Sequence, residues 1–392
     1  MRIGFVTGAY LPAPGGVTTS VVNFSQQLRQ LGHEVLVFCP EYPEEETTDN
    51  KNVHRIPSYY SPLLKDFRLT DPFQAARFFR REFSELDLVH IHLPTIMSTP
   101  ARWIASYYNI PLFFTYHTNL ELYIRHYVPG VPDNIAQAVA RFYARRETKN
   151  GKGIFVPSPD MKSLLESYGL DPSITVLPTG INLDIYNSKS EEVRTLREQF
   201  GIGENEKILL YVGRVGSEKN VGFLLDSFRK VASKFPSVHF VIVGGGRGLG
   251  KVLARVSKMN ASRTIHFTGY VEDDKVLAHF YKEADVFLFA SLTETQGLVI
   301  AEALAAETPV VAVDAPGVRD VLREGRGGYL VPEDVRLFSE KVLTLLNNPD
   351  LLEEKSNEAR EVAKRFSAGT MAEKLLECYL KRLEGENKKR GN

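Results

Sequence analysis

Short apolar runs alternate with longer amphipathic segments along almost the whole chain. Each apolar run is bounded by Gly, Pro or polar residues and is rich in β-branched side chains. Continuous apolar runs of this kind predict strands that are buried on both faces of a parallel sheet. In the first half the predicted strands are residues 3–7, 34–39, 88–92, 111–116, 153–157 and 175–178. In the second half they are residues 208–212, 239–243, 265–268, 286–289, 310–313 and 328–330.

The alternation of strands and helices predicts an α/β protein with doubly wound parallel sheets. The chain has 392 residues, whereas a single hydrophobic core rarely grows past about 250–300. We therefore expect two Rossmann-like domains, residues 1–178 and 179–369, followed by a helix within 370–392. Open sheets of this type bind ligands at the carboxyl ends of their strands. Two such edges that face each other would form a central cleft for a nucleotide.

Composition narrows the classes of protein. Lys and Arg together number 48 and so do Asp and Glu, so no overall charge indicates a nucleic-acid partner. The two cysteines are too few for a disulfide scaffold and suit a reducing cytosol. Because no apolar stretch approaches the roughly 20 residues of a membrane-spanning helix, we expect a cytoplasmic protein that is soluble or lies on a membrane surface.

Glycines follow the first predicted strand, where Gly15 and Gly16 precede a helix. Glycine lets the backbone approach an anion closely, and a helix N-terminus offers unpaired N–H groups. A plain turn explains the same residues. The segment lacks both the Gly-x-Gly-x-x-Gly fingerprint of dinucleotide sites and the lysine of ATP-binding loops.

Two basic residues, Arg214 and Lys219, lie in the loop after the predicted strand 208–212. At the carboxyl end of a strand they are placed to neutralise a diphosphate leaving group, on which charge grows as a glycosidic bond breaks. A solvated surface pair is the alternative.

The segment 291–304 is the most specific part of the sequence, and a helix is expected to start near Gly297 or Leu298. Backbone N–H groups of Gly297, Leu298 and Val299 would then hold a phosphate. Glu302 would accept hydrogen bonds from ribose hydroxyls, and Glu294 would meet sugar hydroxyls. Alternatively, Glu294 is a helix cap and Glu302 a solvated helix residue. The alanines and leucine around Glu302 argue against the second reading, because a buried acid needs a partner.

Histidines complete the candidate chemistry. His117 lies just past the predicted strand 111–116. It either donates a hydrogen bond to a sugar or has a structural role. We expect His90 and His92, on either side of Ile91, to face opposite sides of their sheet, which argues against a shared metal ion. The sequence predicts no metal site.

Taken together, these segments resemble the retaining glycosyltransferases of the GT-B fold, in their large family four. The resemblance covers nearly the whole chain and rests on the motifs Gly15-Gly16, Thr115-Tyr116-His117-Thr118, Pro157-Ser158, Leu177-Pro178-Thr179-Gly180-Ile181, Gly213-Arg214, Glu218-Lys219-Asn220, Glu294 and Glu302. It implies a nucleotide-sugar donor, retention of anomeric configuration, no obligatory metal or other cofactor, and a final helix that packs on the first domain.

The resemblance also assigns roles to residues. Arg214 and Lys219 would clamp the donor diphosphate with Gly16 nearby, and Glu302 would hold the ribose. Glu294 would bind the transferred sugar, and His117 would lie near the reacting centre. Tyr270 and Val271 would contact the base.

The chain departs from the family at two places. It has Gly8-Ala9 where many relatives carry an acidic residue that bears on the acceptor, and Glu307 where relatives usually have a helix-ending Gly.

Within the family, 293–298 and 115–118 most resemble the enzymes that glucosylate diacylglycerol, and a related group mannosylates phosphatidylinositol. Residues 51–152 contain 14 Lys or Arg and 8 Asp or Glu, an excess of six positive charges. In the segment 71–85 a helical wheel sets three arginines opposite several phenylalanines. This pattern suits a helix lying on the anionic inner face of the cell membrane, or an ordinary helix with a phenylalanine core. The predicted membrane residues are Arg77, Phe78, Phe79, Arg80 and Arg81.

The favoured function is therefore transfer of glucose from UDP-glucose to a lipid such as diacylglycerol, with GDP-mannose as the second choice of donor. Alternatives are a transferase of the same fold that uses phosphatidylinositol, a soluble sugar or a polysaccharide as acceptor, a phosphorylase, or a nucleotide-binding regulatory module. An oxidoreductase is disfavoured because the dinucleotide fingerprint is missing.

Overall fold

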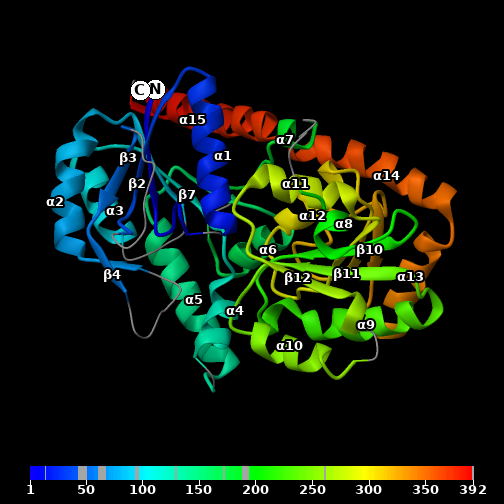
Figure 1. Cartoon of the computed structure of the whole chain (residues 1–392). Coiled ribbons are helices and arrows are strands. Elements are labelled where there is room, and N and C mark those ends of the chain that lie inside the picture. Colours follow the sequence, from blue (N-terminus) through cyan, green and yellow to red (C-terminus); the bar gives the residue numbers. More distant parts are fainter. Residues whose placement is uncertain are drawn as a thin grey trace. The chain divides into compact units, whose positions relative to one another are not determined.

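The structure is a computed structural model that describes residues 1–13, 15–42, 51–60, 68–92, 97–128, 130–170, 173–187, 194–259 and 262–390. The chain divides into two compact units (Figure 1). Unit 1 comprises Met1–Gly180 and Ala368–Asn392, and unit 2 comprises Ile181–Ser367.

Unit 1 contains a parallel sheet in the order β3-β2-β1-β6-β7-β8-β9. Its strands are β1 Arg2–Thr7, β2 Glu34–Pro40, β3 Val53–Ile56, β6 Leu88–His92, β7 Leu112–Thr115, β8 Gly153–Val156 and β9 Ile174–Val176. Two short strands, β4 Ser58–Tyr60 and β5 Arg68–Thr70, pair antiparallel beside it. The six predicted strands are confirmed. β3, β4 and β5 were not predicted, because none of their sequences, Val-His-Arg-Ile, Ser-Tyr-Tyr and Arg-Leu-Thr, is a continuous apolar run.

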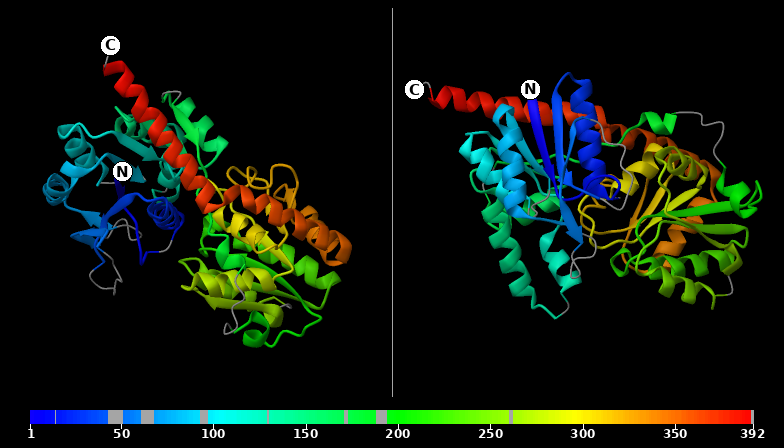
Figure 2. Two further views of the ribbon diagram at one scale, coloured as in Figure 1. Left: turned by 90° about the horizontal axis from the view of Figure 1, so that it is seen from above. Right: turned by 60° about the vertical axis from the view of Figure 1, so that its left-hand side comes forward.

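Helices cover both faces of this sheet (Figure 2). One face carries α1 Gly16–Gln30 and α15 Ala368–Arg390, whose Met371, Leu375 and Tyr379 are buried in the core. The other face carries α2 Pro72–Glu82, α3 Ser98–Tyr107, α4 Leu120–Tyr127, α5 Asp133–Thr148 and α6 Pro159–Ser167. The last helix of the chain is thus part of unit 1, although unit 2 precedes it in the sequence.

Unit 2 contains a parallel sheet in the order β12-β11-β10-β13-β14-β15. Its strands are β10 Lys207–Val212, β11 Val238–Val243, β12 Ile265–Gly269, β13 Val286–Phe289, β14 Val310–Val313 and β15 Gly328–Val331. Its α-helices are α7 Asp184–Asn187, α8 Leu196–Phe200, α9 Val221–Lys234, α10 Leu249–Val256, α11 Asp274–Glu283, α12 Leu298–Ala305, α13 Val335–Leu346 and α14 Pro349–Ala363. The six predicted strands are confirmed.

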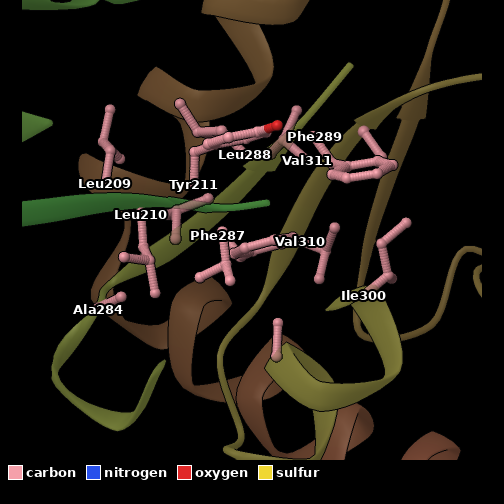
Figure 3. Packing of buried hydrophobic residues seen from close by; sticks show 14 of the residues in the cluster. Leu209, Leu210, Tyr211, Ala284, Phe287, Leu288, Phe289, Ile300, Val310 and Val311 are labelled. Carbon is pink, nitrogen blue, oxygen red and sulfur yellow. The ribbon is translucent and has the colours of Figure 1, made fainter. Parts of the chain in front are cut away.

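Apolar side chains of β10, β13 and β14 form the centre of the unit 2 core (Figure 3). Leu210, Phe287 and Val311 are fully buried among them. Since the strands are parallel, the loops that follow them all lie at one edge of the sheet. Burial of the strands thereby brings together polar loop residues that are far apart in the sequence, such as Lys219 and Glu294, which are 75 positions apart.

The structure corrects the prediction that α2 offers Phe78 and Phe79 to a membrane. Phe79 is fully buried against Phe38 of β2, and Phe78 is partly buried on the same core. The helix turns Phe78 and Phe79 toward the sheet because that face must be covered. The arginines of the prediction, Arg77, Arg80 and Arg81, are exposed.

Glu307, just past the end of α12, has a left-handed backbone with φ 63°. That conformation destabilises the folded state by about 1–2 kcal/mol for a residue with a Cβ, whereas glycine adopts it freely. Compared with alanine, however, glycine loses more backbone entropy on folding, which costs about 0.4–1 kcal/mol. The Glu307 carboxylate bonds to Arg360 at 2.7 Å.

We expect the variant Glu307→Gly to be more stable than Glu307→Ala by about 1 kcal/mol. Both variants lose the exposed ion pair with Arg360, so the difference between their free energies of unfolding reports the backbone conformation alone. Urea unfolding of the two proteins measures it, and equal stabilities would contradict backbone strain at this position.

Candidate active site

The loop after β10 holds the first group of candidate residues. The Tyr211 hydroxyl donates to the Arg214 carbonyl at 3.0 Å and thereby fixes the start of the loop. The Arg214 side chain is half exposed and bonds to the Glu218 carboxylate at 2.9 Å. A short 3-10 turn, Ser217–Lys219, then leads into α9. Arg214 and Lys219 are therefore held close to each other at the carboxyl edge of the unit 2 sheet.

The loops after β10 and β13 are joined by two contacts. Lys219 forms an ion pair with Glu294, and both side chains are largely buried. The Ser291 hydroxyl donates to the Glu218 carbonyl at 3.3 Å. The structure thus brings together three of the residues that the sequence singled out, Arg214, Lys219 and Glu294, and adds Glu218 to them. The alternative that Glu294 caps a helix is wrong, because its carboxylate pairs with Lys219 and the N-cap is Gly297.

Helix α12 begins at Leu298, as the sequence predicts. Its N-cap, Gly297, has φ 70° and ψ 50°, a left-handed conformation that favours glycine. No side-chain oxygen caps this N-terminus. The first backbone N–H of the helix that donates to the Gly297 carbonyl is that of Ile300. The N–H groups of Leu298 and Val299 belong to the orphan donors of a helix start, which suit an anion.

Glu302 lies one turn further along α12. The Tyr281 hydroxyl of α11 donates to its carboxylate at 2.8 Å. Burial raises the pKa of Glu302 to about 7, and the nearby Asp274 carboxylate adds to the rise. The Tyr281 hydrogen bond acts in the opposite direction. The solvated alternative for Glu302 is wrong, since its carboxylate accepts a hydrogen bond from Tyr281 and is buried enough to raise its pKa.

Tyr270 and Val271 follow β12, which is separated from β10 by β11. The Tyr270 side chain is 56% exposed, and Val271 packs partly on the unit 2 core. Both residues lie at the same sheet edge as the preceding groups.

In unit 1, Gly16 is the first residue of α1, and its neighbour Gly15 has φ 154°, which favours glycine. His117 lies in the loop after β7 and is nearly buried. Its Nε2 atom is 3.2 Å from Nδ1 of His92. Burial lowers the pKa of His117 to about 3, so the ring is neutral at physiological pH.

The prediction that His90 and His92 face opposite sides of the sheet is wrong. Side chains two apart along a strand point to the same face, and the two rings stack with centroids 4.2 Å apart. Both rings are fully buried. The place of His92 next to His117 was therefore missed in the sequence. The alternation of side chains along β6 was sufficient to place His90 and His92 on the same face.

Glu218 and Tyr281 were also missed. Glu218 precedes Lys219 directly, so its position was visible in the sequence but its bond to Arg214 was not. Tyr281 is seven residues into α11, and nothing local indicates that it bonds to Glu302.

Comparison with known sequences decides the family. Residues 14–185 match the profile described as "Glycosyltransferase Family 4", and residues 192–364 match "Glycosyl transferases group 1". The chain is 32% identical over 399 residues to the alpha-monoglucosyldiacylglycerol synthase of Acholeplasma laidlawii, with 99% of each chain covered. It is 29% identical to the protein of the same name from Streptococcus pneumoniae, covering 99% of this chain and 87% of that one.

The chain belongs to the family 4 glycosyltransferases of group 1. This glycosyltransferase has the GT-B fold: it matches the structure of Anabaena HepE in complex with UDP with a TM-score of 0.76. The match covers 97% of this chain and all of that one, at 18% sequence identity. The resemblance drawn from the sequence motifs is thereby confirmed at the level of family, fold and enzyme class.

Within the part of the glycosyltransferase that the structure describes, no helix has the length and apolar character required to cross a membrane.

Proposed function

We propose that this glycosyltransferase is a retaining enzyme that transfers glucose from UDP-glucose to a membrane lipid such as 1,2-diacylglycerol. The observation that carries the proposal is the pairing of Lys219 with Glu294, beside the Arg214–Glu218 pair, at the carboxyl edge of the unit 2 sheet. Glu302, held by Tyr281, lies on α12, which begins at the same edge. The full-length similarity to two proteins named as glucosyldiacylglycerol synthases supports the choice of sugar and acceptor.

Unit 2 binds the nucleotide-sugar in this proposal. The guanidinium of Arg214 and the ammonium of Lys219 contact the diphosphate, and the phosphate oxygens take the place of Glu218 as partner of Arg214. The N–H groups of Leu298 and Val299 contact the same phosphates, since a helix N-terminus favours an anion. Tyr270 and Val271 contact the base.

The two carboxylates orient the sugars. Glu302 accepts hydrogen bonds from the ribose hydroxyls, with Tyr281 holding its carboxyl group in place. Glu294 accepts from hydroxyls of the transferred glucose while Lys219 turns to the diphosphate.

The rate increase comes from stabilising the leaving group. As the bond from glucose to the diphosphate breaks, negative charge grows on the phosphate oxygens. Fixed positive groups beside that charge stabilise the transition state more than the ground state, and one such contact contributes about 3–4 kcal/mol. We propose that Arg214, Lys219 and the start of α12 supply this charge without an obligatory metal ion. His117 of unit 1 contributes a contact to a substrate hydroxyl.

A pH dependence of donor binding follows from the raised pKa of Glu302. Below about pH 7 the carboxyl is protonated and loses acceptor capacity, so UDP-glucose should bind more tightly as the pH rises through 7. We expect the dissociation constant to fall roughly tenfold between pH 6 and pH 8, because about a tenth of the carboxyl is ionised one unit below its pKa.

Calorimetric titration with UDP-glucose across this range tests that expectation. The intact sugar nucleotide is required because a terminal phosphate, as in free UDP, itself titrates near pH 6. The control variant Glu302→Gln should bind weakly with no dependence on pH. A pH-independent affinity in the unmodified enzyme would contradict the titration of Glu302 in this range, and normal affinity in Glu302→Gln would exclude Glu302 as the ribose ligand.

An exposed face of unit 1 supports the lipid acceptor. Helices α2 and α3 lie side by side, and the Arg80 guanidinium of α2 stacks over the Tyr107 ring of α3 at 5.3 Å. Phe73, Trp103 and Tyr107 are 84%, 60% and 64% exposed. Arginines together with exposed aromatic rings suit the boundary between lipid headgroups and acyl chains.

Helix α5 extends this face. It is tied to α3 through Arg102, whose guanidinium lies 3.3 Å from the buried Glu147 carboxylate. Ile135, Val139 and Phe142 form an exposed apolar stripe along α5 at helical spacing. Arg141, Arg145, Arg146 and Lys149 are exposed beside the stripe. The combination of apolar and basic residues favours an anionic membrane as the surface on which this enzyme finds its acceptor.

The proposal is tested by offering the purified enzyme a panel of labelled sugar nucleotides with vesicles of diacylglycerol and anionic phospholipid. We expect glucosyl lipid from UDP-glucose, and α-linked product by NMR because the donor linkage is α and is retained. Lipid product from GDP-mannose alone would replace glucose in the proposal. Transfer only to water-soluble sugars would overturn the lipid acceptor.

A further inference from the structure

His90, His92 and His117 of unit 1 form a row of stacked rings. Ring centroids of His90 and His92 are 4.2 Å apart, and those of His92 and His117 are 5.5 Å apart with the planes 16° from parallel. No group of three His, Cys, Asp or Glu side chains in the described ranges has the arrangement of a metal site. The row therefore needs an explanation in terms of hydrogen bonds.

His90 is fixed from both sides. Its Nδ1 atom is hydrogen-bonded to the Tyr379 hydroxyl of α15, and its Nε2 atom lies 2.7 Å from the Thr115 hydroxyl of β7. The His92 ring packs between this fixed ring and Phe5 of β1, whose centroid is 4.5 Å away. The ring plane of His92 is therefore set by β1, β6 and α15 together, and its nitrogens are identified by their hydrogen bonds.

The two nitrogens of His92 differ. Nδ1 is 3.2 Å from Nε2 of His117. Nε2 is buried and has no hydrogen-bond partner among the residues the structure describes. Burial keeps the pKa values of His92 and His117 well below 6.5, so both rings are neutral and only one of them supplies the proton they share.

The direction of the hydrogen bond between His92 and His117 follows from the unpartnered Nε2 atom of His92. If His117 donated, His92 would carry its own proton on Nε2, as a buried N–H without an acceptor. If His92 donates, its Nε2 is a bare lone pair. Buried N–H groups without an acceptor are rarer in proteins than under-satisfied acceptors, so the second arrangement is favoured.

We propose that His92 is a positioning residue for His117: its Nδ1–H donates to Nε2 of His117 and holds that ring as the Nδ1–H tautomer. His117 is thereby a neutral hydrogen-bond donor at Nδ1 and not a base. The inference rests on the proposed contact between His117 and a substrate hydroxyl. The tautomer of His117 is measurable in the enzyme without substrate. A wrong tautomer is therefore distinguishable from failure of the proposed function.

The first test is long-range ¹H–¹⁵N NMR of the full chain with labelled histidine. The chain has nine histidines, and the spectrum of His117→Gln identifies the His117 signals by their loss. We expect the His117 proton on Nδ1 in the unmodified enzyme and its transfer to Nε2 in His92→Phe. A proton on Nε2 of His117 in the unmodified enzyme would overturn the proposal.

The second test separates positioning from packing. His92→Phe removes the donor, whereas His92→Asn retains an amide N–H close to the position of Nδ1. We expect kcat for sugar transfer to fall roughly tenfold in His92→Phe, as for one lost hydrogen bond, with KM for the sugar nucleotide unchanged. His92→Asn should recover most of that loss. Equal losses in the two variants, or no loss in a folded His92→Phe, would show that His92 only fills the core.

Discussion

Replacing Arg214 by alanine should lower kcat for sugar transfer by roughly a hundredfold or more, the usual effect of removing one transition-state contact to a developing anion. The Arg214 side chain is half exposed and bonds to the Glu218 carboxylate, so the substitution leaves no cavity in the unit 2 core. The loss should therefore appear in turnover and not in stability. Steady-state kinetics with the preferred sugar nucleotide, together with thermal unfolding, measure both.

The variant Arg360→Ala is a matched control for Arg214→Ala. Arg360 also lies in unit 2, is exposed to a similar degree and bonds to one carboxylate, that of Glu307. Because Arg360 is on α14, away from the loops that follow β10 and β13, it should retain normal turnover. Near-normal turnover in a folded Arg214→Ala enzyme would refute contact with the leaving group.

Removing the three arginines of α2 should weaken binding to anionic vesicles by roughly a hundredfold. Arg77, Arg80 and Arg81 are exposed, and each basic residue close to an anionic bilayer contributes about 1 kcal/mol. Their joint replacement by alanine leaves the buried Phe79 and Phe83 in the core. Co-sedimentation with vesicles of graded anionic lipid content measures the partition coefficient.

A second triple variant separates local from overall charge. Arg229, Lys230 and Lys234 are exposed on α9 of unit 2, and their replacement by alanine changes the net charge by the same amount. We expect this variant to bind vesicles as the unmodified enzyme does. Equal weakening in both triple variants would show that the attraction is not located on α2, and full retention of the first would remove the membrane surface from the proposal.

The period of hydrophobic positions was sufficient for the fold class and for twelve of the strands, because a strand buried on both faces must be apolar throughout. β3 escaped this rule since it lies at the edge of its sheet and carries His54 and Arg55. Glycine and charge at strand ends likewise located Arg214, Lys219, Gly297 and the start of α12, because the carboxyl edge of a parallel sheet is a property of chain direction alone.

Contacts between distant segments lay beyond such local rules. The partners of Lys219 and Glu302 are 75 and 21 residues away in the sequence, and Tyr379 bonds to His90 across 289 residues. The same holds for α2, where a helical wheel gives the angle between arginines and phenylalanines but not which side faces the sheet. Which groups a side chain meets depends on how strands and helices pack, and packing is a property of the folded chain as a whole.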